Sequence, residues 1–209
     1  MEYNEKHIKI IEAAEKLFSD NGFNGTSVRD IAEAADVNLA MISYYFGSKD
    51  NLLVAIFKYR GENTRQLVAG MVENKELSPL EKFYVLIDFY IDKFQNQQCF
   101  HRVMAREQII HTHGPVASAI LNVKKTNQEL IKQLVQEGQR KKQFKKEIDI
   151  SLMMNTLFGT VNHLYTTKHY YKELNNLQSL SDEQFEKQLR KKLSVYLKSL
   201  FKAILTYED

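Results

Sequence analysis

The spacing of apolar residues constrains the fold more than any other feature, because they recur every three or four positions along most of the chain. In the first stretch, Ile8, Ile11 and Phe18 fall on one side of a helix drawn over residues 4–20. Only two prolines and eight glycines interrupt the 209 residues, so few positions oppose helix formation. The sequence therefore predicts an all-α protein.

Capping signals divide the chain into separate helices. Gly22 can end the first helix, Ser27 with Asp30 forms a capping box, and Asn38 can cap a third short helix. A longer helix opens near Ser48. The later helices are expected at residues 78–94, 99–111, 116–142, 149–171 and 181–206. We predict an N-terminal three-helix domain at residues 1–48 and a larger helical domain at residues 49–209.

Composition narrows the class of protein. With 44% apolar and 26% charged residues, the chain can bury a core. Its N-terminus has no secretory pattern, and no apolar run reaches the ~20 residues of a membrane span. The single Cys99 excludes an intrachain disulfide; an intermolecular bridge stays open, but an idle thiol in a reducing compartment is favoured. We therefore expect a soluble, cytoplasmic protein with no membrane partner.

The net charge of +3 is weak evidence about partners. The first fifty residues carry an excess of acids: Glu2, Glu5, Glu12, Glu15, Asp20, Asp30, Glu33, Asp36 and Asp50. The bases there are fewer: Lys6, Lys9, Lys16, Arg29 and Lys49. A nucleic-acid-binding domain usually shows a basic face, so any argument for DNA binding has to rest on local placement.

The most informative segment is residues 26–49, TSVRDIAEAADVNLAMISYYFGSK. Its apolar residues are spaced to point into one small core: Val28, Ile31, Ala32, Val37, Ile42 and Phe46. The small side chain of Ala32 lets the two short helices cross closely, as in a helix-turn-helix. The third helix then presents an uncharged outer face, formed by Asn38, Leu39, Ala40, Met41, Ser43 and Tyr44. A solvated face normally carries Lys and Glu, so this face indicates a partner.

At these residues the chain resembles the TetR family of bacterial transcriptional regulators. The matching motif reads Thr26-Ser27-Val28-Arg29-Asp30-Ile31-Ala32, Ala35-Asp36-Val37, Tyr44-Tyr45-Phe46 and Ser48-Lys49-Asp50-Asn51-Leu52. The match is close over the first fifty or so residues and general beyond them. Two positions depart from the family pattern. Asp36 replaces the turn glycine, although Asp tolerates the left-handed conformation, and Ser43 replaces a tyrosine, which leaves base preference open.

The resemblance implies a helix-turn-helix whose third helix enters the major groove. Asn38, Leu39, Ala40, Met41 and Tyr44 would then face bases, with Ser43 beside them. Thr26, Ser27, Tyr45 and Lys49 would hold phosphates, and Arg29 could serve either purpose. The implied function is that of a transcriptional regulator, expected to be a repressor bound to a near-palindromic operator on double-stranded DNA.

The C-terminal part is rich in aromatic residues and methionines, which suits an ordinary helical core. The resemblance favours a pocket for a small, largely apolar effector between the helices, and we place it at Phe89, Phe100, Met104 and Phe158. The last helix carries a broad apolar stripe. It is either buried within one subunit or part of a homodimer interface formed by the last two helices, and both readings can hold together; the resemblance favours the interface.

Other chemistry is weakly represented. His101, His111 and His113 lack the spacing of a metal site, so no metal or cofactor is predicted. No phosphate-cradling glycine loop, Cys-x-x-Cys or nucleophile motif occurs, so we do not predict an enzyme, although that class remains an alternative. A second alternative is an interaction protein whose short helices bind another protein rather than DNA.

Overall fold

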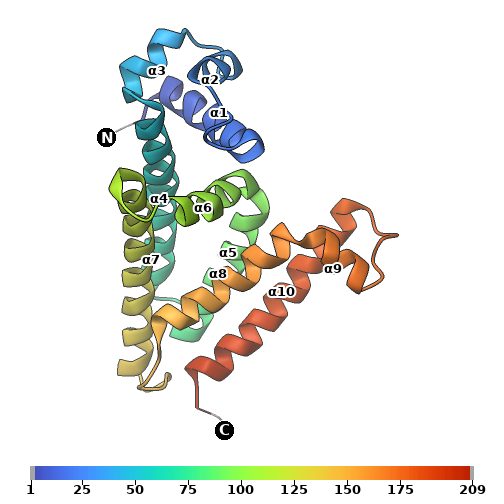
Figure 1. Ribbon diagram of the computed structural model, residues 1–209. Helices are drawn as coiled ribbons and strands as arrows, with labels where there is room; N and C mark the ends of the chain where they lie inside the picture. The colour runs from blue at the N-terminus through green and yellow to red at the C-terminus, as the bar shows by residue number, and fades with distance from the viewer. Residues whose placement is uncertain (1–2, 208–209) are drawn as a thin grey trace. The chain divides into compact units, whose positions relative to one another are not determined.

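The computed structural model describes residues 3–207, which form helices joined by short loops (Figure 1). The helices are α1 (Glu5–Asn21), α2 (Val28–Ala34), α3 (Leu39–Phe46), α4 (Lys49–Glu73), α5 (Pro79–Asn96), α6 (Gln98–Ile110), α7 (Gly114–Arg140), α8 (Ile150–Thr166), α9 (Lys168–Leu174) and α10 (Asp182–Leu205). No strand occurs over these residues, so the all-α prediction is confirmed. Within the same range, no helix combines the length and apolarity needed to span a membrane.

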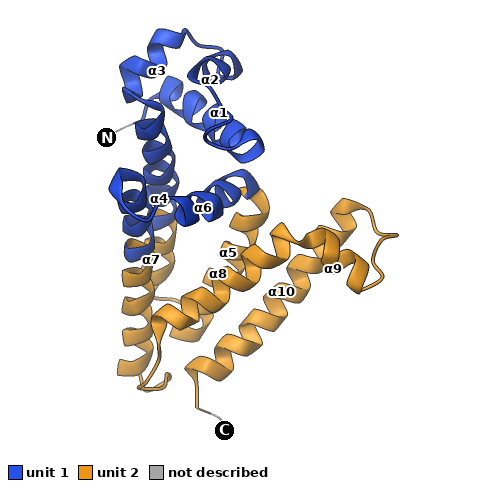
Figure 2. Ribbon diagram, in the orientation of Figure 1, with its two compact units in different colours: residues 1–65, 98–125 blue, residues 66–97, 126–209 orange. Residues whose placement is uncertain are grey.

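The chain packs as two compact units (Figure 2). Unit 1 comprises Met1–Arg65 and Gln98–Lys125, and unit 2 comprises Gln66–Gln97 and Thr126–Asp209. The helices α4 and α7 each contribute residues to both units. The units thus follow packing and not chain order. The predicted domain division after residue 48 concerns function, and it stays a prediction.

The core of unit 1 joins the apolar faces of six helices, α1, α2, α3, α4, α6 and α7. Ile10 and Phe18 of α1 are buried against Ile31 of α2 and Ile42 of α3. α4 adds its own apolar residues, and Phe57 lies edge-on to Phe100 of α6 with ring centroids 6.1 Å apart. Short helices such as α2 and α3 bury little alone, so their fold depends on this shared core.

The predicted core of the segment 26–49 is confirmed at four positions: Ile31, Ala32, Ile42 and Phe46 are buried. Val37 is half-buried and packs against the same cluster. The prediction for Val28 is wrong, because this side chain is 36% exposed. Val28 is the first residue of α2, and its neighbour three positions on, Ile31, already fills the inward side of this short helix.

An ion pair inside unit 1 fastens α1 to α4. The Arg60 guanidinium donates to both carboxylate oxygens of Glu15, over 2.8 and 3.2 Å, and both side chains are largely buried. Burial alone would lower the pKa of Arg60, but the hydrogen bond and charge of Glu15 outweigh it and raise the pKa. A second link joins α6 to α1, where Arg106 donates to the backbone carbonyl of Phe18 over 3.0 Å.

Unit 2 is built around α5, which packs against α8 and along α10. Polar links run beside the apolar contacts. Arg190 donates to both oxygens of Asp92 over 2.5 and 2.8 Å, and Asp88 accepts from Ser194 over 2.6 Å and from Lys198. These bonds cross from α5 to α10 and therefore help to fix the register of the two helices.

A buried lysine closes the other end of α5. Lys82 is 3% exposed and donates to the Val72 carbonyl over 2.7 Å and to Glu137 of α7 over 2.8 Å. Burial raises the pKa of Glu137, but its hydrogen bonds with Lys141 and Lys82 prevail and lower it. The buried ammonium of Lys82 is therefore paired and hydrogen-bonded, as a buried charge requires.

The segment 149–171 was predicted as one helix, and the structure corrects this. It divides at Thr167, with φ −112°, into α8 and the short α9. At the break, Thr166 donates its hydroxyl to the Asn162 carbonyl over 2.7 Å, and Thr167 donates its hydroxyl to the His163 carbonyl over 2.6 Å, beside the bond from its own amide. Such side-chain bonds compete with the helical backbone pattern.

We predict that Arg60→Ala lowers the free energy of unfolding by about 3 kcal/mol, because it leaves the buried Glu15 carboxylate without its cation. Arg65, one turn further along α4, pairs with Glu62 at the surface, so Arg65→Ala serves as the control and should leave the unfolding midpoint nearly unchanged. Urea denaturation measures both. Equal midpoints for the two variants would contradict the structural role of the Glu15–Arg60 pair.

Candidate nucleic-acid interface

The start of α2 is fixed by a capping box. The Asp30 amide donates to Ser27 Oγ over 3.1 Å, and the Ser27 amide donates to Asp30 Oδ2 over 2.8 Å. The backbone and side-chain hydrogen bonds of Ser27 lower the pKa of Asp30. This box, predicted from the sequence, is confirmed, and its two bonds satisfy the amides of Ser27 and Asp30 at the start of α2.

The turn between α2 and α3 depends on one unusual backbone conformation. Asp36 has φ +52°, the left-handed region that favours glycine but that Asp tolerates. The Val37 amide then reaches back to the Ala32 carbonyl over 3.0 Å, and Asn38 Oδ1 accepts from the Ala40 amide over 2.8 Å to begin α3. The predicted left-handed turn at Asp36 and the predicted cap at Asn38 are both present.

The outer face of α3 is as uncharged as the sequence indicates. Asn38, Ala40 and Ser43 are exposed, Leu39 is 41% exposed and Tyr44 is 83% exposed. Met41 is half-buried, and Ile42 and Phe46 anchor the opposite face in the core of unit 1. α3 therefore offers solvent a row of amide, aliphatic, hydroxyl and phenol groups on a rigid base.

Two further predicted contacts are Tyr45, on α3 itself, and Arg29, on α2. Tyr45 is half-buried, because its ring packs at 4.1 Å from the imidazole of His7 in α1, and Tyr44 lies beside it at 5.2 Å. Arg29 is exposed on α2, next to the exposed Ser27. The structure thus brings most predicted DNA contacts onto α2 and α3 of unit 1.

Thr26 lies in the connection between α1 and α2, and Lys49, the first residue of α4, contacts that connection. Thr26 is 1% exposed, and its hydroxyl donates to the Gly22 carbonyl over 2.9 Å and is within 3.2 Å of the Leu17 carbonyl. A phosphate contact by its side chain remains a prediction, and it would require these bonds to break.

The Lys49 ammonium closes the same connection. It donates to the carbonyls of Phe23 and Thr26 over 2.8 and 2.9 Å, and it lies 4.3 Å from the centre of the Phe23 ring. We call this arrangement of Lys49, Thr26 and Phe23 the loop anchor. An ammonium has three donors, so one stays available for the phosphate contact predicted for Lys49.

The four predicted pocket residues lie in two separate cores. Phe100 is buried in the core of unit 1, where Met104 packs against it. Phe89 and Phe158 pack against the core of unit 2. A single pocket lined by all four residues therefore remains a prediction.

The structure contains three features that were not predicted from the sequence. Glu107, only 1% exposed, lies 3.1 Å from the imidazole of His111; a spacing of four residues on one helix was the available signal. The loop anchor had no such signal, because Lys49 lies 26 and 23 residues from its two acceptors. The buried hydroxyl of Tyr90 also had no signal, because the sequence indicates only that the C-terminal part is rich in aromatic residues.

Comparison with known proteins decides the family. Residues 10–56 match the model for bacterial regulatory proteins of the tetR family, and residues 62–191 match that for the C-terminal region of YsiA-like proteins. The chain belongs to the TetR family. As a member of this family it is a helix-turn-helix transcriptional regulator that binds DNA. The family model and the relatives it matches describe transcriptional regulators and not enzymes.

One relative and two solved structures align with this TetR-family regulator over nearly their whole length. The protein named "Probable HTH-type transcriptional regulator YttP" of Bacillus subtilis is 28% identical over 198 residues, covering 93% of each chain. Among solved structures, the fatty acid degradation regulator FadR from Bacillus halodurans gives a TM-score of 0.72 at 22% identity, covering 95% of this chain and 97% of that one. FadR from Bacillus subtilis in complex with stearoyl-CoA gives 0.70 at 20%, covering 92% and 97%.

The backbone at Asp36 yields a prediction about the turn. Asp36→Val should lower the free energy of unfolding by about 1–2 kcal/mol, because a β-branched residue is strained at positive φ, whereas Asp36→Gly should not destabilise. Glu33→Val, in the helical part of α2, is the matched control and should cost only the small difference in helix propensity. Chemical denaturation compares them, and a larger loss for Glu33→Val would contradict the assignment.

Proposed function

We propose that this TetR-family regulator is a cytoplasmic repressor that binds a near-palindromic operator as a homodimer and leaves it when a small, largely apolar ligand binds. The exposed, uncharged face of α3 carries the proposal. A helix with these side chains on a rigid base suits reading of base edges in the major groove, where amides, hydroxyls and apolar groups distinguish bases.

Within this proposal the predicted contacts divide by position. Asn38, Leu39, Ala40, Met41 and Tyr44 face bases, with Ser43 beside them. Ser27, Arg29 and Tyr45 hold phosphates, together with the remaining donor of Lys49, and Thr26 contributes mainly through the loop anchor. Phosphate contacts position a protein on the duplex, and base contacts specify the sequence.

The dimer interface is proposed on the outer faces of the last long helices, α8 and α10. Three large apolar residues there are well exposed: Leu152 on α8 at 65%, Val195 on α10 at 64% and Tyr196 on α10 at 59%. Gly159 lies on α8 with no atom within 4 Å of the position of an added Cβ, which permits close approach of another helix. A second copy of the chain would cover this surface in a two-fold arrangement.

A two-fold dimer explains how a short reading helix can be selective. One α3 offers few base contacts, and a pair doubles them at half-sites about 34–36 Å apart or a multiple of that.

The ligand proposal draws on FadR from Bacillus subtilis, which was solved with stearoyl-CoA. Because α4 supplies residues to both units, strain introduced in unit 2 reaches α4; a coupling of ~1–3 kcal/mol would change DNA affinity some 5- to 150-fold.

We predict distinct effects for Arg29 and Tyr44 on DNA binding. Arg29→Ala should weaken binding to all duplexes and reduce the salt slope by roughly one, because a phosphate contact is lost. Tyr44→Ala should instead change the sequences selected from a random duplex pool. Lys187→Ala, exposed on α10, is the control and should do neither. If the wild type showed no salt-dependent retardation of any duplex, the alternative of a protein-binding module would be favoured.

We predict that Val195→Glu converts the dimer into monomers at low micromolar concentration, because each copy would bury an unpaired carboxylate at the interface. Leu121→Glu, which alters a residue 49% exposed on α7, should leave the dimer intact. Sedimentation equilibrium measures both. A Val195→Glu variant that remains dimeric would place the interface elsewhere.

A further inference from the structure

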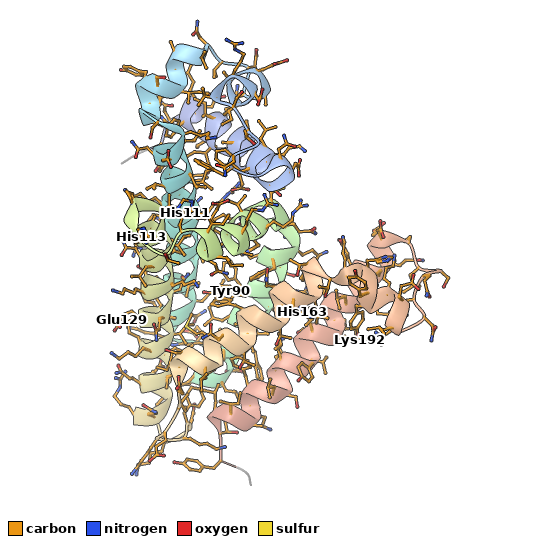
Figure 3. All side chains as sticks on the ribbon, in the orientation of Figure 1. Tyr90, His111, His113, Glu129, His163 and Lys192 are labelled. Carbon is orange, nitrogen blue, oxygen red and sulfur yellow. The ribbon has the colours of Figure 1, made fainter. Side chains whose placement is uncertain are left out.

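The outer face of α3 lacks the side chains that most often identify guanine and cytosine. Guanine is usually read by Arg or Lys through its O6 and N7 atoms, and cytosine by a carboxylate that accepts from its amino group. Residues 37–48 contain no charged side chain. Side chains of α3 nevertheless project into solvent (Figure 3), so this helix has to distinguish bases by other means.

The two cations nearest to α3 in the sequence do not replace the missing ones. The Lys49 ammonium donates to the carbonyls of Phe23 and Thr26. Arg29 lies exposed on α2, where the proposed function assigns it to a phosphate. Neither residue belongs to α3, so the outer face of this helix has no cation of its own for a guanine contact.

The amide of Asn38 is committed to the fold in a way that limits its use on adenine. Asparagine reads adenine with both ends of its amide, because the oxygen accepts from the N6 amino group while the nitrogen donates to N7. In this chain Asn38 Oδ1 accepts from the Ala40 amide over 2.8 Å and caps α3. The oxygen is thus directed at the first turn of α3, and the two-bond pair with adenine would break the cap.

The first turn of α3 offers apolar side chains instead. Leu39 is 41% exposed, and Ala40 beside it is exposed as well. N-terminal residues of a recognition helix are the ones that contact base edges. Four residues further on, the same rows of the helix carry the hydroxyls of Ser43 and Tyr44. The apolar part of the reading face is therefore confined to its first turn.

An aliphatic side chain in the major groove favours thymine over the other bases. The C5-methyl group of thymine is the apolar group that a base presents there. Cytosine presents its amino group at the neighbouring position of the groove. Against leucine this amino group would lose its water without gaining an acceptor, which is unfavourable.

We propose that Leu39 and Ala40 contact the C5-methyl groups of thymines in each operator half-site, and that Leu39 determines the specificity for thymine at the position it faces. The selection of bases by the first turn of α3 then depends on methyl groups and not on hydrogen bonds from charged side chains. The inference rests on the proposed function and names the bases that this part of α3 selects.

Removal of the methyl group from the DNA tests this with the wild-type protein. The full chain first selects its operator from random duplexes. Each thymidine of the half-site is then replaced, in both halves, by deoxyuridine, which pairs identically but lacks the methyl group. Burial of one methyl changes affinity about fourfold, so replacement at the position facing Leu39 should weaken binding about 15-fold over the two halves. Fluorescence anisotropy at fixed salt measures the affinities.

A second duplex series returns the methyl group to a different base pair. At the position where deoxyuridine weakens binding most, the T·A pair is replaced by a C·G pair that carries either cytosine or 5-methylcytosine. The C5-methyl group of 5-methylcytosine occupies the place of the thymine methyl. The wild type should therefore bind the methylated duplex about fourfold more tightly for each half-site than the duplex with cytosine.

Leu39→Ala assigns the effect to one side chain. This variant should reduce the ratio of thymine to uracil affinity at one position to within about twofold. Leu67→Ala, which changes another exposed leucine, 56% exposed on α4, is the matched control and should keep the full ratio.

Three results would overturn the proposal while leaving the proposed function in place. They are a selected half-site without thymine, wild-type affinity that deoxyuridine changes by less than about twofold at every position, and a Leu39→Ala variant that keeps the full ratio everywhere. The first two need no variant, so they decide the matter even if Leu39→Ala folds poorly. Failure of the wild type to select any duplex would instead overturn the proposed function, on which this inference rests.

Discussion

The packing of α2 and α3 onto α1 and α4 is the interaction on which the rest of unit 1 depends. With seven and eight residues, α2 and α3 are too short to persist alone in water. They are held in place because Ile31, Ile42 and Phe46 enter a core to which the longer helices α1 and α4 also contribute. The Glu15–Arg60 ion pair fixes that larger frame from within. The outer face of α3, on which the proposed base contacts lie, is therefore held in place by residues buried beneath it.

The loop anchor shows how one side chain can serve folding and binding together. The Lys49 ammonium donates hydrogen bonds to two backbone carbonyls, those of Phe23 and Thr26, which have no helical partner in the connection after α1. The same ammonium lies at the start of α4, where a helix N-terminus favours anions. The phosphate contact proposed for Lys49 would therefore involve a residue that also stabilises the fold, which makes Lys49 a poor choice for separating binding from stability experimentally.

Local signals in the sequence predicted most of the elements, since caps and apolar stripes act within a turn or two of the chain. The capping box at Ser27, the left-handed turn at Asp36 and the uncharged face of α3 all follow from neighbouring residues. The break at Thr167 was not predicted, because no glycine or proline lies near it in the sequence. The loop anchor and the split of α4 and α7 between two units were beyond reach, because they depend on residues far apart in the chain.

The absence of charge on α3 has a consequence for how such a regulator meets a chromosome. Attraction to arbitrary DNA comes almost entirely from cations that displace counterions from phosphates, and the reading helix supplies none. Its neighbours carry more acids than bases over the first fifty residues. The weaker this attraction is, the less time the regulator spends on non-specific sites. The ratio of specific to non-specific affinity governs how often the operator is occupied. Weak adhesion can thus favour rapid search and leave discrimination to contacts made only at the correct site.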